Sequence, residues 1–458
     1  MAQGDSDILV RKILTIAGSD SGGGAGIQAD LKTITVLGGY GMSVVTALTA
    51  QNTVAVRAIQ LVTTEFVEAQ MEAVLSDIGA DGVKTGMLAT PEIVRAVAAG
   101  LRRHPIQRLV IDPVMIAKGG DRLLTEEAEA TLIRELLPLS YLLTPNLAEA
   151  ESLCGFPVRN LEEMRNAAER IHELGTRNVL IKGGHLPGEA VDLLFDGGTF
   201  RTFASPRIAT KTTHGTGCTY SAAITTLLAQ GHPLEDAVTI AKDFITRAIG
   251  AGINVGAGYG PTNPFVWISR QLERPNVLSA LEQAYNALAS EVLGWIIPEV
   301  RSNFGYATEG ACSREDVAAF PGRLTEIKNR IIAIRRPEFA GSRHIARVIL
   351  AAMRYHPELR SAINIRYTSD ILKACQRCGL RIASFSRADE PTDVKLREGS
   401  TLEWGTERAF SGCVDPPDVI YDEGEVGKEP MIRLFGRTPN EVVDKIKCIA
   451  SQYLNPLQ

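Results

Sequence analysis

The run from Thr213 to Ala223 carries residues that could do chemistry, because Thr216 and Cys218 stand where a glycine-rich turn meets small and apolar residues typical of a helix. Gly215 and Gly217 allow the backbone to turn tightly with its N–H groups converging. A helix N-terminus of this kind attracts anions, and its dipole favours the thiolate form of a cysteine in the first turn. The run therefore predicts an anion cradle beside a reactive thiol, which suits phosphoryl transfer. The alternative is a glycine-rich turn that only caps a core helix.

A second glycine-rich segment spans residues 18–26, between a strand-like run and a helical stretch. It fits neither GxxxxGK[ST] nor GxGxxG, so a Rossmann cofactor is disfavoured.

The elements that must position these turns alternate along the first half of the chain. Apolar runs at 13–17, 44–48, 109–113, 141–145 and 179–182 are typical of strands, and helical periodicity at 125–137, 161–174 and 234–250 lies between or after them. This order predicts an α/β fold with a mostly parallel sheet and helices on both faces. Ligands of such sheets gather at the carboxyl ends of the strands.

The alternation ends in a loop rich in glycine and proline at 252–264, and a helical pattern resumes at 277–293. We place a domain boundary near Arg274 and Pro275, with domains at 1–270 and 277–458, and expect a second α/β domain of open topology. In this second domain Ser342 is a candidate N-cap, which would put Arg343 and His344 in the first turn of a helix at 345–353. A solvated basic helix is the alternative.

Composition excludes several classes of protein. Of the 458 residues, 45% are hydrophobic and 22% charged, and the net charge is −5, which argues against a nucleic-acid binder. The chain has no apolar stretch long enough to span a bilayer and no secretory signal at its start, so we expect a cytoplasmic protein without a membrane partner. The seven cysteines show no disulfide framework, and we expect Cys375 and Cys378 to serve packing rather than zinc.

Several ordered motifs of the first domain resemble one family. They are the segment from Gly18 to Asn52, Lys84-Thr85-Gly86-Met87-Leu88, Asp112-Pro113-Val114-Met115, Thr144-Pro145-Asn146-Leu147-Ala148-Glu149, Lys182-Gly183-Gly184-His185 and Gly215–Cys218. Together they resemble the hydroxymethylpyrimidine kinase/phosphomethylpyrimidine kinase of thiamine biosynthesis, a ribokinase-like enzyme, over about residues 10–265. The resemblance implies two successive phosphorylations of the pyrimidine, with ATP as donor and Mg²⁺.

The resemblance also implies a role for individual residues. The pyrimidine would contact Ala25, Asp30, Gln51, Met87 and Val114; ATP and its phosphates would contact Asp112, Asn146, Glu149 and Thr216, with Asp112 and Glu149 near Mg²⁺; and the catalytic set would be Lys182, Gly215, Gly217 and Cys218. These types suit the task, because carboxylates are hard ligands for magnesium and a lysine offsets phosphoryl charge. Two alternatives stay open: Asn146 and Glu149 have the spacing of a capping box, and Met87 and Val114 suit a plain core.

Many ribokinase-like enzymes carry aspartate at the position of Cys218. The first acceptor is a neutral alcohol, whereas the second is an ionised phosphate that a fixed carboxylate would repel. We hypothesise that a thiol, which can be neutral or charged, lets one site perform both steps.

The second domain resembles the archaeal-type thiamine-phosphate synthase domain over about 277–458. The motifs that carry this resemblance are Pro298–Ala307, Asp316–Arg323, Ser384-Phe385-Ser386-Arg387, Pro417–Asp422 and Gly427–Ile432. It implies joining of the pyrimidine diphosphate to thiazole phosphate with release of pyrophosphate. The family's functional arginine and histidine fall on Arg323 and His344, and Arg343, Arg387 and Lys428 are further candidates.

We therefore expect a bifunctional enzyme of thiamine biosynthesis that acts on small molecules, as a homodimer. Two alternatives remain: a pyrimidine kinase joined to a non-catalytic ligand-sensing domain, and a kinase for pyridoxal or a similar vitamin alcohol, which Asp30 and Gln51 disfavour.

Overall fold

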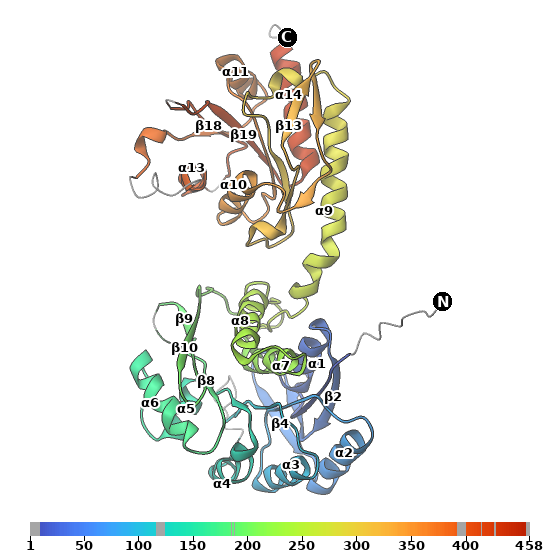
Figure 1. The fold of residues 1–458 in the computed structure, drawn as a ribbon, viewed down its shortest axis with the longest axis vertical. Coiled ribbons are helices and arrows are strands. Elements are labelled where there is room, and N and C mark those ends of the chain that lie inside the picture. The colour runs from blue at the N-terminus through green and yellow to red at the C-terminus, as the bar shows by residue number, and fades with distance from the viewer. Residues whose placement is uncertain are drawn as a thin grey trace, which may run out of the picture. The chain divides into compact units, whose positions relative to one another are not determined.

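The computed structural model describes residues 10–115, 124–184, 186, 188–391, 400–413, 415–425 and 427–454. The chain divides into two compact units, 1–268 and 269–458, which we treat separately (Figure 1). Among the described residues, no helix combines the length and the apolar character that crossing a membrane requires.

Unit 1 is built on a sheet whose described strands lie in the order β10-β9-β8-β7-β6-β5-β1-β2. Neighbours from β8 to β2 are parallel, and β9 and β10 are antiparallel additions, which confirms the mostly parallel α/β sheet. The strands are β1 (Lys12–Ala17), β2 (Tyr40–Val45), β5 (Gly82–Thr85), β6 (Leu109–Ile111), β7 (Leu142–Leu143), β8 (Val179–Ile181), β9 (Ala190–Phe195) and β10 (Phe200–Ser205).

Helices cover both faces of this sheet (Figure 1). One face packs on α7 and α8 around Val110, Leu180 and Phe244, and the other packs on α2, α3, α4 and α6 around Leu14, Val97 and Ile171. The helices of unit 1 are α1 (Gly26–Val36), α2 (Thr64–Asp77), α3 (Pro91–Arg103), α4 (Glu126–Thr131), α5 (Leu147–Cys154), α6 (Leu161–His172), α7 (Thr216–Ala229) and α8 (Leu234–Gly250), with a π-helical turn Leu132–Leu136 and a 3₁₀ turn Leu137–Leu139 after α4.

The strand expected at 44–48 is wrong in its bounds. β2 ends at Val45, and β3 (Ala47–Gln51) pairs instead with β4 (Val56–Leu61) in a separate two-stranded sheet. Leu48 and Ile59 on this pair are 54% and 42% exposed, so an apolar run here does not mark a buried strand.

Unit 2 contains a second sheet with the described order β15-β12-β11-β16-β19-β18-β17, which is antiparallel except between β17 and β18. Helices α9, α11 and α14 pack on one face and α10 and α13 on the other, and a hairpin of β13 and β14 lies beside it (Figure 1). The strands are β11 (Phe304–Ala307), β12 (Val317–Ala319), β13 (Leu324–Ile327), β14 (Arg330–Ala333), β15 (Glu338–Phe339), β16 (Ser361–Arg366), β17 (Ile382–Ser384), β18 (Val419–Asp422) and β19 (Met431–Gly436). The helices are α9 (Val266–Ala289), α10 (Arg343–Met353), α11 (Ser369–Arg377), α13 (Ser400–Phe410) and α14 (Pro439–Leu454), with 3₁₀ turns at Gly294–Ile296, Arg314–Asp316 and Arg387–Asp389.

The chain does not break at Pro275, where we expected a boundary, because α9 runs through this proline. Two contacts just before Pro275 already hold the helix to unit 2: Arg270 lies 3.3 Å from Asp316, and Arg274 stacks 3.6 Å above the ring of Phe339. The units divide instead at Ile268, so the residues around Pro275 belong to unit 2.

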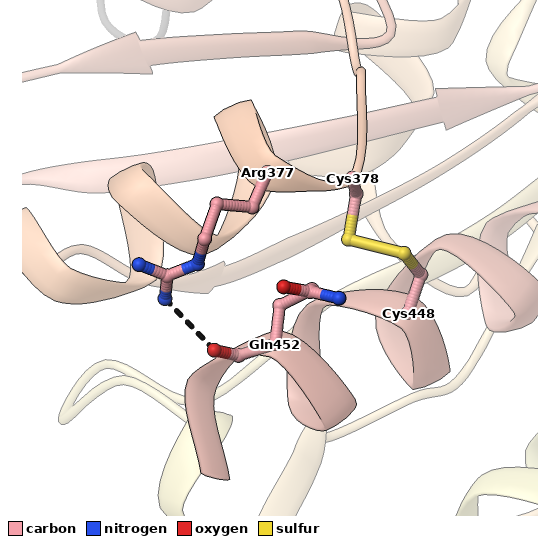
Figure 2. Close-up of a disulfide and its surroundings, with 4 residues drawn as sticks. All are labelled: Arg377, Cys378, Cys448 and Gln452. Carbon is pink, nitrogen blue, oxygen red and sulfur yellow. Dashed lines mark hydrogen bonds between the residues drawn. A yellow bond between two sulfur atoms is a disulfide. The ribbon is translucent and has the colours of Figure 1, made fainter. Parts of the chain in front are cut away.

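A disulfide joins Cys378, at the end of α11, to Cys448 on α14 (Figure 2). The expectation that Cys378 serves only packing is therefore wrong, whereas Cys375 is a buried free thiol as expected. The two bonded cysteines are 70 residues apart, so no local spacing could reveal the pair. Beside the bridge, Arg377 donates to the carbonyl of Gln452 at 2.8 Å and ties the same two helices (Figure 2).

Candidate active sites

The polar residues of unit 1 gather where parallel strands end. Asp112 follows β6 and Lys182 follows β8, and Lys182 Nζ lies 2.8 Å from Asp112 Oδ1. Both side chains are largely buried, and the pKa of Asp112 is lowered because Lys182 and Lys84 outweigh the opposing effect of burial. Gly217 lies against this pair: a Cβ there would come within 3.3 Å of Lys182 Nζ and 3.5 Å of Asp112 Oδ2. The glycine thus leaves open the space beside a lysine and a carboxylate at the start of α7.

Asn146 and Glu149 form the capping box that their spacing indicated. The Asn146 amide donates to Glu149 Oε2 at 2.8 Å, and the Glu149 amide donates to Asn146 Oδ1 at 3.0 Å. Glu149 is 6% exposed, and burial, aided by Asp112 and opposed by Lys182, raises its pKa to about 7. Glu149 therefore belongs to the same charged cluster as Asp112 and Lys182.

The turn before α7 is shaped by contact between two glycine-rich loops. Gly215 has a left-handed φ of 75°, and a Cβ there would lie 1.7 Å from the carbonyl oxygen of Gly24, so only glycine fits. Thr216 occupies the first helical position of α7, and its hydroxyl donates to the carbonyl of Thr213 at 2.8 Å. Cys218 follows in the first turn, as predicted.

The expected reactivity of Cys218 is wrong. Burial, opposed by Lys84 and aided by Asp30, raises the pKa of the thiol to about 11. Desolvation of the thiolate thus outweighs the field of the helix end. Cys218 is a neutral thiol at physiological pH.

Met87 and Val114, two of the predicted pyrimidine contacts, lie in one small apolar cluster with Ala47 and Ala89. Asp30 is fully buried, at 0% exposure. Its carboxylate accepts hydrogen bonds from Lys84 at 2.8 Å and from Thr15 at 2.6 Å. Burial would lower the pKa of Lys84, but the carboxylate of Asp30 raises it, so the two form a buried ion pair.

Ala25 and Gln51 lie where the two glycine-rich loops are joined by Asp20 and His214. Asp20 accepts from the Ala25 amide at 2.8 Å and lies 2.9 Å from His214 Nε2, and the Gln51 amide lies 3.4 Å from the same imidazole nitrogen. The structure thus places Ala25 and Gln51 beside the turn that leads to Cys218.

Unit 2 has a cavity of about 400 Å³ whose lining includes Arg301, Asn303, Arg323 and Ser342. Arg301 and Arg323 have left-handed φ values of 67° and 69°, a conformation that costs roughly 1–2 kcal/mol for a residue with a side chain. Ser342 is the N-cap residue of α10, but its hydroxyl donates to Asn303 Oδ1 at 2.8 Å and accepts no capping hydrogen bond from the described N–H groups of the helix, which corrects its expected capping role.

His344 lies in the first turn of α10, as predicted. Although His344 is an exposed residue, its pKa is lowered to about 4. The largest cause is desolvation of the imidazolium by the surrounding protein, followed by repulsion from the positive charges of Arg433, Arg323, Arg387 and Arg347. The imidazole is therefore neutral at physiological pH. Arg323 is close enough for its charge to act on His344, so the structure brings this predicted pair together.

Of the further candidates, Arg387 also lies close enough for its charge to act on His344. Arg343 lines a separate hollow with Arg314 and Arg347, and Lys428 pairs with Glu425 at 3.7 Å on the surface. His185, quoted among the family motifs, is outside the described residues.

Several residues that the structure brings to the two sites were not expected from the sequence: Lys84, Asp20 and His214 in unit 1, and Arg301, Asp422 and Arg433 in unit 2. A signal existed for Arg433 and Lys84, because each is a charged residue inside an apolar strand, where a partner is required.

Comparison with known proteins finds a matching family model for each unit. A family model described as phosphomethylpyrimidine kinase matches residues 20–263, and one described as thiamine-phosphate synthase ThiN matches residues 280–448. The Thiamine biosynthesis bifunctional protein ThiED of Geobacter sulfurreducens is 56% identical over 252 residues, which are 55% of this chain and 51% of that protein. The Hydroxymethylpyrimidine/phosphomethylpyrimidine kinase of Bacillus subtilis is 46% identical over 260 residues, which are 56% of this chain and 96% of that protein.

Solved structures similar to this chain include two pyridoxal kinases. An ADP complex from Bacillus subtilis has a TM-score of 0.53 and 41% identity, covering 56% of this chain and 98% of that one. A complex with AMP-PCP and pyridoxal from Staphylococcus aureus has a TM-score of 0.53 and 36% identity, covering 56% of this chain and 95% of that one. These neighbours confirm the ribokinase-like fold expected for unit 1.

Proposed function

Because the chain belongs to the phosphomethylpyrimidine kinase family, we propose that unit 1 phosphorylates 4-amino-5-hydroxymethyl-2-methylpyrimidine twice, first at its alcohol and then at the new phosphate. The observation that carries this proposal is the open space at Gly217, bounded by Lys182 Nζ and the Asp112 carboxylate at the first turn of α7. Free N–H groups at a helix start, a lysine and a carboxylate are what a phosphoryl group with a magnesium ion requires.

ATP and Mg²⁺ fit the residues present. Asp112 and Glu149 supply hard carboxylate oxygens, and Gly217 keeps the adjoining space free of a side chain, so we propose that these residues hold the metal and the phosphates. Bound Mg²⁺ would neutralise charge on the transferring group. Lys182 holds its ammonium toward the same space and offsets negative charge there, and the N–H groups of Thr216 and Gly217 bind oxyanions.

Cys218 allows both acceptors to bind. Its thiol is neutral, because its pKa is raised to about 11 by burial, so it does not repel the phosphate that the first step forms. An aspartate at this position would place a fixed negative charge against that phosphate.

We propose that Met87 and Val114 contact the ring of the pyrimidine and that the side-chain amide of Gln51 forms a hydrogen bond with the polar edge of the ring. Asp30 stays a predicted contact. Its two oxygens are engaged by Lys84 and Thr15, so contact with the substrate would require it to exchange one of these bonds.

We propose that unit 2 is the thiamine-phosphate synthase. The bond from the pyrimidine methylene carbon to the diphosphate oxygen breaks, the thiazole nitrogen forms a bond to the same carbon, and pyrophosphate leaves with the electron pair. Arg323 at the cavity stabilises the leaving charge, and neutral His344 can donate a hydrogen bond to it. Because Arg323 and His344 lie together in a domain that matches the synthase model, the ligand-sensing alternative is not supported.

The direct test is to incubate the purified full chain with hydroxymethylpyrimidine, thiazole phosphate, ATP and MgCl₂ and to follow thiamine phosphate by mass spectrometry. We expect pyrimidine monophosphate, diphosphate and then thiamine phosphate, and no thiamine phosphate without thiazole phosphate. Failure to form the pyrimidine diphosphate would contradict the kinase assignment.

Pyridoxal belongs in the same assay, because the similar solved structures include pyridoxal kinases. We expect the hydroxymethylpyrimidine to be the better substrate by kcat/KM. A higher kcat/KM for pyridoxal would reverse the assignment of unit 1. The homodimer stays a prediction.

A further inference from the structure

Polar residues replace the apolar core at one end of the sheet in unit 2. On the face that α10 covers, Ala362, Ile420 and Phe435 pack in a cluster with Ile345 and Ile349. Side chains two positions apart share a face, so Asn364 on β16, Asp422 on β18 and Arg433 on β19 extend the same face. Asn364 pairs in register with Arg433, and Asp422 closes β18 beside them.

Asp422 is shared by two arginines. Arg433 Nη1 lies 2.9 Å from Asp422 Oδ2, and Arg387 Nε lies 2.6 Å from Asp422 Oδ1. The side chains of Arg433, Asp422 and Arg387 are 2%, 0% and 10% exposed. Counting the ion pairs of the part of the chain that the structure describes, two guanidinium groups on one carboxylate leave an excess positive charge in a buried place, which is costly without an anion. Burial lowers the pKa of Arg433 even though Asp422 opposes this.

The excess charge lies at the proposed synthase site. The charges of Arg433 and Arg387 act on the imidazole of His344, and so does the charge of Arg323. Arg323 lines the cavity of about 400 Å³. Arg323 itself donates to the carbonyl of Val300, a neutral acceptor, so it does not reduce the excess.

A second pair of basic residues nearby shows the contrast. At the opposite ends of β17 and β18, Arg381 and Lys445 share Asp418, but Arg381 also faces Asp415 and Lys445 also faces Glu441. Three carboxylates thus serve two cations there, and Arg381 is 51% exposed. This pair is balanced and solvated, and it needs no ligand.

We propose that Arg387 and Arg433, held side by side by Asp422, bind a phosphoryl oxyanion, and that Asp422 is the residue that positions them. This inference rests on the proposed synthase function, in which the oxyanion is the diphosphate of the pyrimidine substrate or the phosphate of the thiazole. Bound there, the oxyanion supplies the charge that Asp422 alone does not, and the two arginines join Arg323 in stabilising it.

The experiment titrates the full chain with sodium pyrophosphate and, in a second arm, with inorganic phosphate, and follows the imidazole NMR signals of His344, identified by their loss in His344→Gln. His344 belongs to unit 2, so its imidazole signal reports on binding in that unit. We expect pyrophosphate to raise the pKa of His344 and Arg387→Gln to weaken pyrophosphate binding at least tenfold. Arg381→Gln, the matched control, should change binding less than twofold. Equal binding by these two variants, or no response of the wild-type signal, would overturn the site.

Asp422→Asn separates positioning from charge. Removing a negative charge should by itself tighten anion binding, whereas loss of positioning should weaken it at least tenfold. Tighter binding would therefore overturn the role of Asp422. If Asp422→Asn does not fold, as judged by the melting of unit 2, Arg387→Gln still decides the proposal because Arg387 is partly exposed.

The two phosphate arms identify the ligand. Tighter binding of pyrophosphate than of phosphate supports the diphosphate, and the reverse assigns the thiazole phosphate. Thiamine phosphate synthesis is measured on the same preparations. A wild-type chain that binds pyrophosphate through Arg387 but makes no thiamine phosphate would refute the synthase function and not the site; normal synthesis by Arg387→Gln would refute the site alone.

Discussion

Cys218 shows how the environment of one residue decides its chemistry. Its position at the start of α7 favours a thiolate, but burial beside Asp30 and Asp112 outweighs the helix end and raises the pKa to about 11. In the proposed kinase site, this neutral thiol would repel neither the alcohol nor the phosphate acceptor, whereas an aspartate would repel the phosphate.

Replacement of Cys218 by aspartate should therefore affect the two phosphorylations unequally. For Cys218→Asp we expect the second step to fall at least tenfold more than the first, because the new carboxylate repels only the phosphorylated substrate. Each step is measured separately, with the alcohol or the monophosphate supplied as substrate, and Cys218→Ser is the uncharged control. Equal losses in both steps would count against a role for charge here.

The raised pKa of Cys218 also predicts its reactivity toward iodoacetamide. Because only the thiolate reacts and its fraction grows tenfold per pH unit below the pKa, alkylation should still be accelerating between pH 8 and pH 10. Mass spectrometry of the peptide that contains Cys218 measures the rate, with the exposed Cys312 as internal reference. A rate that levels off below pH 8 would show a thiolate instead.

Lys84 and Asp30 form a fully buried ion pair, and removal of one partner should be costly. Lys84→Met leaves the Asp30 carboxylate buried without its cation, so we expect a loss of about 3–5 kcal/mol in the stability of unit 1. Denaturant unfolding measures this loss, and Lys32→Met, which removes an exposed lysine of α1, is the control. If both variants lose the same small amount, the pair contributes little.

At the scale of elements, the sequence predicted regular features better than their ends. The helix at 234–250 has the expected bounds, because its apolar periodicity is uninterrupted. The break at Pro275 is absent: α9 runs through the proline, and Arg270 and Arg274, which precede it, already contact unit 2. The strands that carry Asp112 and Lys182 could be recognised from apolar runs, and their meeting at one sheet edge followed from parallel order. The partners of Asp30 and Arg433 could not be predicted, because they lie on other elements and the contacts depend on how α1 packs on the first sheet and how β18 pairs with β19.

The disulfide between α11 and α14 is an element-scale feature that can be tested by mutation. It closes a loop of 70 residues, for which chain entropy gives about 4 kcal/mol of stabilisation. We expect Cys448→Ser to lower the melting temperature of unit 2 while leaving that of unit 1 unchanged. Cys413→Ser, which removes an exposed free thiol, serves as the control. Identical melting of the two variants would show that the bridge does not stabilise unit 2.

At the scale of the whole molecule, the chain has two units with their own cores. We propose that each carries one site and that the two sites handle one heterocycle in succession. In this proposal, unit 1 ends with a diphosphate on the pyrimidine, and unit 2 uses that diphosphate as its leaving group. Both proposed sites offer a cation for phosphoryl charge: Lys182, whose Nζ lies beside Gly217 in the first turn of α7, and Arg323, which lines a cavity together with the N-cap residue of α10.

Mixing two inactive variants tests this separation most directly. Lys182→Ala should lack the kinase steps and Arg323→Ala should lack coupling, so neither alone should convert hydroxymethylpyrimidine, thiazole phosphate and MgATP to thiamine phosphate. An equimolar mixture should restore synthesis, because the diphosphate made by the Arg323→Ala chain reaches the intact unit 2 of the other. A mixture that stays inactive, or an Arg323→Ala chain that still couples at the wild-type rate, would contradict two independent sites.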